Sequence, residues 1–211
     1  MATFKDLRDQ ISADLAANAG NLLDTEINEA INAAIEDYEN KRFVFNEGRD
    51  TSISTVVGQS EYDLPSTVLT VDQVQYLFAG HLYRLQRQTY EWYVEALVNQ
   101  TAQVGPSNHY TIYERKLFLY PLPDLVTTVT LSGVIRQPNV PLTNDSDSNA
   151  WTNEARQLIR ARAKMDLFIN RLYEPTLAQA QDAIAKDYET KLVADRDALR
   201  LIGHARPFRQ F

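Results

Sequence analysis

The sequence predicts an α+β protein in which helices at both ends form a bundle and a β-rich segment is inserted between them. Apolar residues recur at helical spacing in the first forty residues and again after Trp151. Between these regions, β-branched and aromatic residues alternate with turn signals, as in strands. Helices at the ends with strands between them are typical of this class. The expected organisation is a helical core of residues 1–46 and 150–203, an insertion of residues 47–149 and a C-terminal extension of residues 204–211.

Two helices are predicted before residue 46. The first places four apolar residues at three- and four-residue spacing: Phe4, Leu7, Ile11 and Leu15. The second begins at Asp24 or Thr25, either of which is a suitable N-cap residue. Its apolar face has small residues between larger ones, which suits close packing against another helix: Ile27, Ala30, Ile31, Ala34, Ile35 and Tyr38.

The middle of the chain is predicted to consist mainly of strands joined by short turns. Residues 51–57 and 60–65 flank Gly58-Gln59 and indicate a hairpin. Two further pairs of strands are expected on either side of residues 79–81 and of the two-residue turn Glu114-Arg115. Residues 126–135 alternate well enough to form a longer strand.

A short helix is predicted from Thr89 to Leu97, with Tyr90, Tyr93 and Val94 on the same face as Leu97. Two more helices are expected after the polar loop of residues 143–149. The first begins at Trp151. The second begins at Pro175, since proline is well tolerated at the first helical position, and runs to Gly203.

The composition favours a globular chain and removes several kinds of chemistry. The 211 residues include 28 acidic and 21 basic side chains, a formal net charge of −7. Cysteine is absent, which excludes thiol nucleophiles, disulfides and thiolate metal sites. No apolar stretch resembles a signal peptide or is long enough to cross a bilayer, so neither export nor a membrane span is expected.

We expect neither a nucleotide-binding site nor a metal-binding site. The seven glycines are scattered, so neither a P-loop nor a dinucleotide-binding cluster is formed, and the three histidines are isolated. The string Asp145-Ser-Asp147-Ser-Asn149 matches the opening of an EF-hand loop. The match ends there. Position six of the loop, which needs glycine, is Ala150, and position twelve, which needs a bidentate glutamate, is Arg156. We therefore expect a polar loop that leads into a helix capped by Asn149 or Thr152, and we expect no cofactor.

The charge is distributed unevenly along the chain. Residues 1–150 hold 20 acidic and 10 basic side chains, whereas residues 151–171 hold five basic and two acidic ones. The basic segment has two interpretations. Its cations pair with acidic neighbours of the same chain, or they form a subunit interface with the acidic surface of a second copy. The candidate interface residues are Arg156, Arg160, Arg162 and Lys164. One basic helix is too little for a sequence-specific DNA-binding face.

Five short signatures follow one another in a distinctive order. They are RFVFNE at 42–47, TVVGQSEYDLP at 55–65, KLFLYPLP at 116–123, DSDSNAWTNEA at 145–155 and LIRARA at 158–163. In this order they resemble the adaptor, or head-to-tail connector, proteins of tailed bacteriophages. The resemblance extends from about residue 23 to about residue 200.

This resemblance implies a structural virion protein without catalytic activity. Such adaptors usually form a ring of twelve copies beneath the portal protein, at the head–tail junction of a virion assembled in the host cytoplasm. The ring continues the DNA channel and offers a docking surface to tail proteins, either nozzle or fibre. Genomic DNA would pass without specific binding, and an acidic subunit suits that passage because it repels a polyanion.

Two further surfaces are candidates for partner contacts. By its position, the C-terminal extension would reach the portal, and it offers aromatic and cationic side chains for docking: Arg206, Pro207, Phe208, Arg209 and Phe211. A frayed terminus is the alternative. Tyr90, Trp92 and Tyr93 are candidates for contact with tail components, with a role in the core as the alternative. Two other classes stay open, an interaction module unrelated to phages and a hydrolase or nuclease with a site scattered over the fold.

Overall fold

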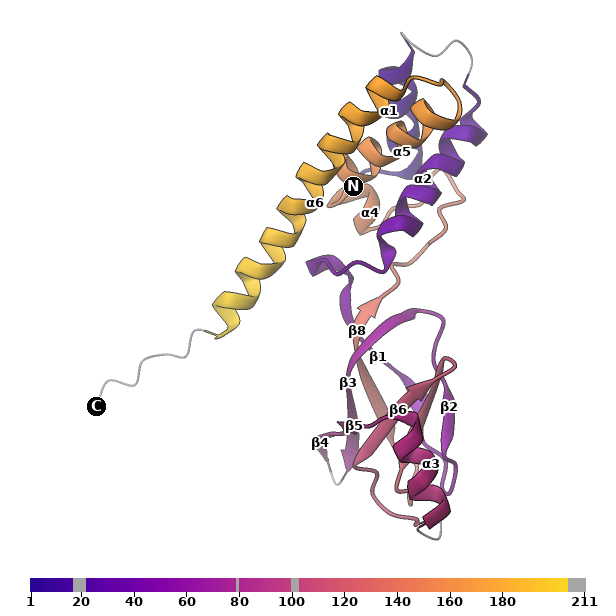
Figure 1. Cartoon of the computed structure of the whole chain (residues 1–211), viewed down its shortest axis with the longest axis vertical. Helices are drawn as coiled ribbons and strands as arrows, with labels where there is room; N and C mark the ends of the chain where they lie inside the picture. Colours follow the sequence, from indigo (N-terminus) through magenta and orange to yellow (C-terminus); the bar gives the residue numbers. More distant parts are fainter. Residues whose placement is uncertain (17–21, 79, 100–102, 205–211) are drawn as a thin grey trace, which may run out of the picture. The chain divides into compact units, whose positions relative to one another are not determined.

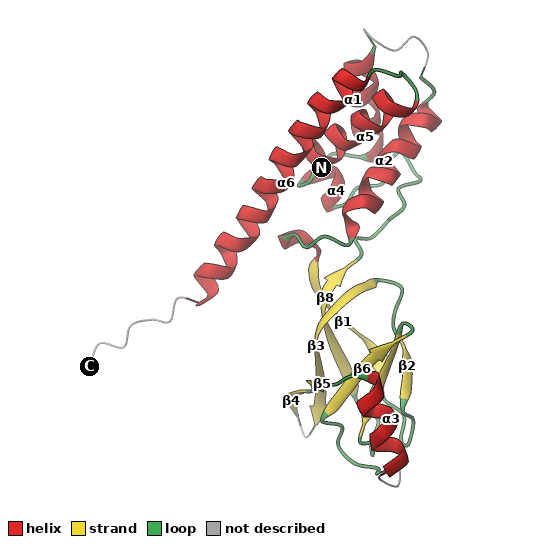
Figure 2. Cartoon of the chain, in the orientation of Figure 1, coloured by secondary structure: helices red, strands yellow, loops and turns green. Residues whose placement is uncertain are grey.

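The computed structural model describes residues 1–16, 22–78, 80–99 and 103–204 and confirms the α+β class. The chain divides into two compact units. The helical unit comprises Met1–Asn46 and Arg136–Phe211, and the β unit comprises Glu47–Ile135. Figure 2 shows helices in the first unit, and two sheets with one helix in the second.

The helical unit contains five of the six α-helices found in the described residues. They are α1 (Phe4–Leu15), α2 (Asp24–Glu39), α4 (Ala150–Asn153), α5 (Arg156–Asn170) and α6 (Pro175–His204), with a short 3₁₀ helix at Val44–Asn46. Thr3 and Asp6 form a capping box at the start of α1. The prediction that Asp24 or Thr25 caps α2 was wrong. Leu23 is the N-cap residue, and its amide donates to Glu26 at 3.1 Å.

The core of the helical unit joins apolar faces from both ends of the sequence. Phe4, Leu7 and Ile11 of α1 are buried together with Ile27 and Ile31 of α2. The matching residues from the C-terminal part are Trp151, Leu158, Ile159, Ala163, Leu167 and Phe168. The indole of Trp151 meets the rings of Phe43 and Phe45 edge-on, with centroid distances of 5.9 and 4.9 Å. Two signatures more than one hundred residues apart in sequence therefore meet in one aromatic cluster.

Residues 136–149 belong to the helical unit, although the sequence predicts them in the insertion. Arg136 makes two hydrogen bonds to the carboxylate of Glu39, at 2.7 and 3.0 Å. The side chain of Asn32 donates to the carbonyl of Leu142 and accepts from its amide. Leu142 itself is 2% exposed. These contacts join residues about one hundred positions apart, so local patterns do not predict them.

The last helix, α6, begins at Pro175 as predicted, after Tyr173 adopts a left-handed conformation with φ 55°. Ala178 and Ala185 are buried against the rest of the unit, and Tyr188 and Leu192 are partly buried. Figure 1 shows α6 running beside α5 and continuing past it toward the C-terminus. The helix includes Gly203 and ends at His204.

In its described residues, the β unit consists of two four-stranded sheets. Sheet 1 has the order β1-β8-β3-β4 and sheet 2 has the order β2-β7-β6-β5. The bounds are β1 Glu47–Ser54, β2 Glu61–Asp63, β3 Val68–Phe78, β4 His81–Arg84, β5 Gln86–Arg87, β6 His109–Tyr113, β7 Lys116–Tyr120 and β8 Thr128–Ile135, with α3 at Tyr90–Asn99. Residues of both sheets share one core, including Val74, Tyr76, Leu117, Leu119 and Leu131.

The predicted hairpin of residues 51–57 and 60–65 was wrong. Strand β1 pairs with β8, so that Asp50 lies opposite Leu131, whereas β2 pairs with β7 in the other sheet. The segment between them is held by the hydroxyl of Tyr62, which donates to the carbonyl of Gln59 at 2.9 Å. Strand composition and a turn signal predict that strands form, but they do not predict which strands pair.

Other features of the β unit agree with the sequence. Strands β6 and β7 form the predicted hairpin, and both Glu114 and Arg115 have positive φ, as a two-residue type I′ turn requires. Strands β3 and β4 also pair as predicted. In β8, a Cβ atom at Gly133 would lie 1.9 Å from the carbonyl oxygen of Thr70, so the backbones of β8 and β3 approach too closely for any other residue.

Candidate functional site

The basic segment lies on α5, and its cations pair with acidic side chains of the same chain. Arg160 donates to both carboxylate oxygens of Asp14, at 2.8 and 2.5 Å, and Lys164 lies 3.0 Å from the same group. Burial of Asp14 acts to raise its pKa. The hydrogen bonds from Arg160 and Lys164 outweigh that effect, so the pKa lies below its ordinary value.

Two more arginines of α5 and its end pair with α2. Arg162 donates to Asp37 at 2.8 Å, and Arg171 lies 3.4 Å from Glu26. Pairing within the chain, the first interpretation of the basic segment, is what the structure shows for Arg160, Arg162 and Lys164. The Nε atom of Arg156 is buried and has no hydrogen-bond partner among the described residues. Contact of this segment with a second copy stays a prediction.

The EF-hand-like string forms a loop that holds the start of α1. Asp147 accepts hydrogen bonds from the amides of Asn144 and Thr143, at 2.8 and 2.9 Å, which lower its pKa. The carboxylate of Asp145 pairs with Arg8 at 2.9 Å. Asn149 caps α4, as predicted, by accepting from the amide of Trp151. Within the described part of the chain, no group of three or more acidic or histidine side chains is placed to hold a metal ion.

The aromatic residues proposed for contact with tail components pack within the β unit. Tyr93 is 4% exposed and lies against Phe118, with a centroid distance of 5.1 Å. Tyr90 stacks on Tyr113 at 4.2 Å. Trp92 meets Tyr120 edge-on at 5.7 Å. These contacts hold α3 against sheet 2. Val94, which was predicted on the same face, is instead exposed, and Ala96 is buried in its place.

The residues proposed for portal docking lie outside the described residues. Arg206, Pro207, Phe208, Arg209 and Phe211 all follow His204, the last residue of α6. Their role stays a prediction.

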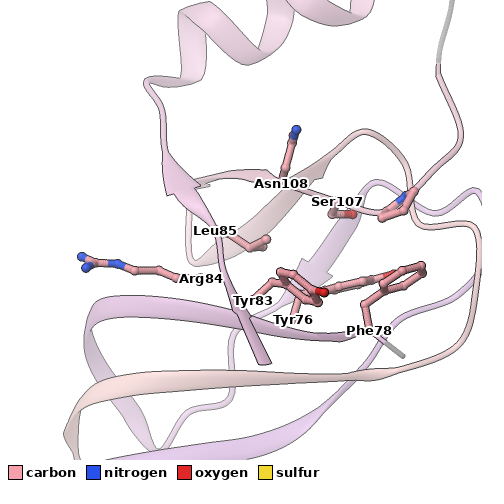
Figure 3. A pocket seen from close by; sticks show the side chains of 8 residues that line it. Tyr76, Phe78, Tyr83, Arg84, Leu85, Ser107 and Asn108 are labelled. Carbon is pink, nitrogen blue, oxygen red and sulfur yellow. The ribbon is translucent and has the colours of Figure 1, made fainter. Parts of the chain in front are cut away.

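An open pocket in the β unit was not predicted from the sequence. It has a volume of about 380 Å³ and is lined by Tyr76 and Phe78 of β3, by Tyr83 of β4, by the adjoining Leu85 and by residues 106–108. Figure 3 shows the three aromatic rings gathered together, while Arg84 points away from them. The rings of Phe78 and Tyr83 are 6.2 Å apart. Tyr83 is 50% exposed although it shares a sheet face with the buried Tyr76, its partner across the strands.

The helical unit exposes apolar side chains along the hairpin of α5 and α6. Ile169 of α5 is 46% exposed and lines a pocket of about 280 Å³ with Met165, Pro175, Ala178, Gln179 and Asp182. Leu177 and Ile184 of α6 are 36% and 41% exposed. No helix in the described residues is long and apolar enough to cross a membrane.

The apolar pockets of the two units are candidate contact surfaces for other proteins. Such surfaces suit the class of structural interaction proteins. The chain matches the family described as SU10 adaptor protein over residues 2–209, and it belongs to that family. A comparison with curated proteins finds no match.

This family membership confirms the resemblance to phage adaptor proteins that the ordered signatures indicated. The chain is therefore a structural component of a phage particle that works through other head and tail proteins. The signatures also have physical roles. Trp151, Asn149 and Asp147 of the 145–155 signature are buried or nearly buried and join α4 to the loop before it.

Proposed function

We propose that copies of this chain form a ring beneath the portal, at the head–tail junction of the virion, which continues the DNA channel toward the tail. The helical unit forms the core of the ring, and the β unit is the insertion that offers tail proteins a docking surface. A ring of twelve copies is the number that the resemblance implies. Assembly takes place in the host cytoplasm, and no catalytic step is involved. Membership of the adaptor family supports this proposal.

The observation that carries the ring is that two opposite flanks of α6 offer different surfaces, exposed apolar side chains on one and the pocket beside Ile169 on the other. Leu177 and Ile184 are seven residues apart and therefore lie on one flank. The pocket beside Ile169 is lined by Asp182, which is two residues from Ile184 and hence about 200° away around the helix. A closed ring needs contacts between two different faces of each subunit. The ridge of Leu177 and Ile184 and the pocket beside Ile169 supply two such faces.

The charge of the chain suits a channel for DNA. The formal net charge is −7, and three of the cations on the most basic helix already pair with Asp14 and Asp37 of the same chain. A ring of such subunits has few unpaired cations on α5 with which to hold phosphates. It repels a polyanion at short range, within the screening length of about 10 Å at 0.1 M salt.

Electron microscopy of the purified chain mixed with its portal protein tests the ring. We expect a ring of adaptor density attached to the portal, formed on the portal as template. Persistent monomers with no complex would refute the proposed function.

The contact with the portal is assigned to residues 204–211, which offer two phenylalanines and two arginines. A chain that ends at Gly203 tests this assignment against the full-length chain. We expect the shortened chain to fold, as judged by circular dichroism, but to lose co-sedimentation with the portal. Unchanged co-sedimentation would move the portal contact elsewhere on the chain.

A further inference from the structure

The pocket in the β unit lies where sheet 1 ends. Tyr76, Phe78 and Tyr83 project from one face of β3 and β4, the face that elsewhere forms the shared core of the two sheets. At Tyr76 this face is covered, since that residue is 1% exposed. At Tyr83 it is half open, since that residue is 50% exposed. A core-facing aromatic ring that stays uncovered at the edge of a sandwich can bind a side chain from another protein.

The backbone beside this pocket also lacks a neighbour. Strand β4 is the last strand in the order β1-β8-β3-β4, and no other strand of the described residues pairs with its outer edge. Its four side chains are all exposed. An edge strand next to a pocket is the arrangement by which an extended segment of another protein is bound, through main-chain hydrogen bonds and one inserted side chain.

Five of the eight residues that line the pocket are aromatic or aliphatic, and Arg84 points away from the rings (Figure 3), which favours an apolar occupant. The hydroxyl of Ser107 already donates to the carbonyl of Pro121 at 2.8 Å. The hydroxyl of Tyr76 is buried and has no hydrogen-bond partner among the described residues, so it can donate to a main-chain carbonyl of a bound segment. Three rings and Leu85 supply most of the remaining lining. A bulky apolar side chain therefore fits the pocket better than a polar small molecule.

The basic residues at the edge of β4 indicate the charge of the extended segment that binds there. Residues 81–88 hold two arginines and a histidine but no acidic residue, whereas the whole β unit holds nine acidic and five basic residues. An acidic segment complements this edge. The chain's own residues 204–211 carry two arginines and no acidic residue, so they are the wrong sign for it.

We propose that the edge of β4 and the pocket beside Tyr83 bind an extended, acidic segment of a tail protein, with one bulky apolar side chain seated against Tyr76, Phe78 and Tyr83. This inference rests on the proposed function, because it assigns the docking surface for tail components to a defined place. It moves that surface from α3, whose aromatic residues pack against sheet 2, to the edge of sheet 1 and the pocket beside it.

A pair of substitutions introduced into the phage tests the pocket. Tyr83→Ala removes the half-open ring, and Leu82→Ala is the matched control. Leu82 is the adjacent residue, is 53% exposed and lies on the opposite face of the same strand. We expect Tyr83→Ala particles to keep the adaptor but to lose a tail protein by about tenfold or more, since loss of a central aromatic anchor has effects of that size. Tyr83→Phe and Leu82→Ala particles should keep it.

Two outcomes separate this inference from the proposed function. If wild-type particles hold no adaptor at the head–tail junction, the proposed function fails, and this inference fails with it. If the adaptor is present and Tyr83→Ala particles keep every tail protein, or if Leu82→Ala particles lose as much, only this inference is overturned. Thermal unfolding of the purified variants shows whether either substitution has unfolded the chain.

A photo-cross-linking residue at position 83 identifies the occupant directly. Tyr83→p-benzoylphenylalanine keeps an aromatic ring in place, and mass spectrometry of irradiated particles gives the sequence of the captured peptide. We expect a segment of a tail protein with acidic residues around a bulky apolar one. Capture of a basic segment, or of a second copy of this chain, would overturn the inference.

Discussion

The two units of the chain close their cores to different extents. In the helical unit, Trp151 is 1% exposed and completes an aromatic cluster with Phe43 and Phe45. In the β unit, Tyr83 faces the same side as the buried Tyr76 yet stays 50% exposed. The first unit thus encloses the aromatic cluster of its core, whereas the second leaves a core-facing ring open at the edge of a sheet. An open core position marks a contact surface more clearly than an exposed side chain on an outer face.

The units also differ in how charge is used. Arg160, Arg162 and Lys164 of α5 each pair with an acidic side chain of α1 or α2, so charge ties the helices together. Strand β4 and the residues after it carry exposed arginines beside an open pocket. Three of the basic residues predicted at a subunit interface pair within the chain, and a less conspicuous pair of arginines lies beside the candidate site.

Removal of the buried indole should have the largest effect on stability. Trp151→Ala should lower the free energy of unfolding by about 3–5 kcal/mol, because it leaves a cavity against Phe43 and Phe45. Tyr83→Ala should lower it by less than about 1 kcal/mol, the usual range for surface substitutions. Urea denaturation of both variants checks the contrast. Equal losses would show that Tyr83 belongs to a closed core.

The close approach of β8 and β3 gives the second prediction. Gly133→Ala places a methyl group 1.9 Å from the carbonyl oxygen of Thr70, so the β unit should lose roughly 1–3 kcal/mol of stability through overpacking. Gly105→Ala is the matched control, because nothing lies within 4 Å of its new Cβ atom. Hydrogen exchange should show lost protection in β3 and β8 for the first variant alone. Normal protection there would mean that the strands separate easily.

The ion pairs of the helical unit should make the free energy of unfolding depend on pH in the acidic range. The pKa of Asp14 is lowered in the folded chain, so its contribution to stability is present above its unfolded pKa of about 4 and is lost as the pH falls through the folded value. The urea midpoint of the wild type should therefore fall below about pH 4. Asp14→Asn should flatten that dependence, because it removes the carboxylate that Arg160 and Lys164 contact. Parallel curves for wild type and Asp14→Asn would contradict the assignment.

The smallest effect is expected from an exposed ion pair of α6. Lys186 lies 2.6 Å from Asp182, one helical turn earlier, and its side chain is 70% exposed. Lys186→Ala should cost only about 0.3–0.5 kcal/mol, and high salt should abolish the difference. Thermal unfolding at two salt concentrations checks this. A loss above 1 kcal/mol would show that this exposed ion pair stabilises the helical unit more than exposed pairs usually do.

The sequence predicted helices better than strand partners. The spacing of Phe4, Leu7 and Ile11 is local, and the helix it predicts is present as α1. The hairpin predicted around Gly58-Gln59 failed because β1 and β2 find distant partners in different sheets, about 80 residues away for β1 and about 55 for β2. The Glu114-Arg115 turn succeeded because a two-residue turn fixes the pairing of the strands beside it.

The candidate site was less predictable than the fold. Tyr83 was one of many aromatic residues in the middle of the chain, and its sequence context does not show that its ring is left uncovered. That property depends on where β4 ends sheet 1 and on the distant residues 106–108. A usable signal was present in residues 81–88, whose arginines and histidine stand out in an acidic region.

The ring is tested most directly by joining the two flanks of α6 in neighbouring copies. The chain has no cysteine, so Gln179→Cys on the pocket flank and Ile184→Cys on the ridge introduce the only thiols. In complex with the portal and a short bismaleimide cross-linker, the double variant should give a ladder of covalent oligomers, while each single variant stays monomeric. Dimers from a single variant, or no ladder from the double variant, would contradict a ring built from two different faces of each subunit.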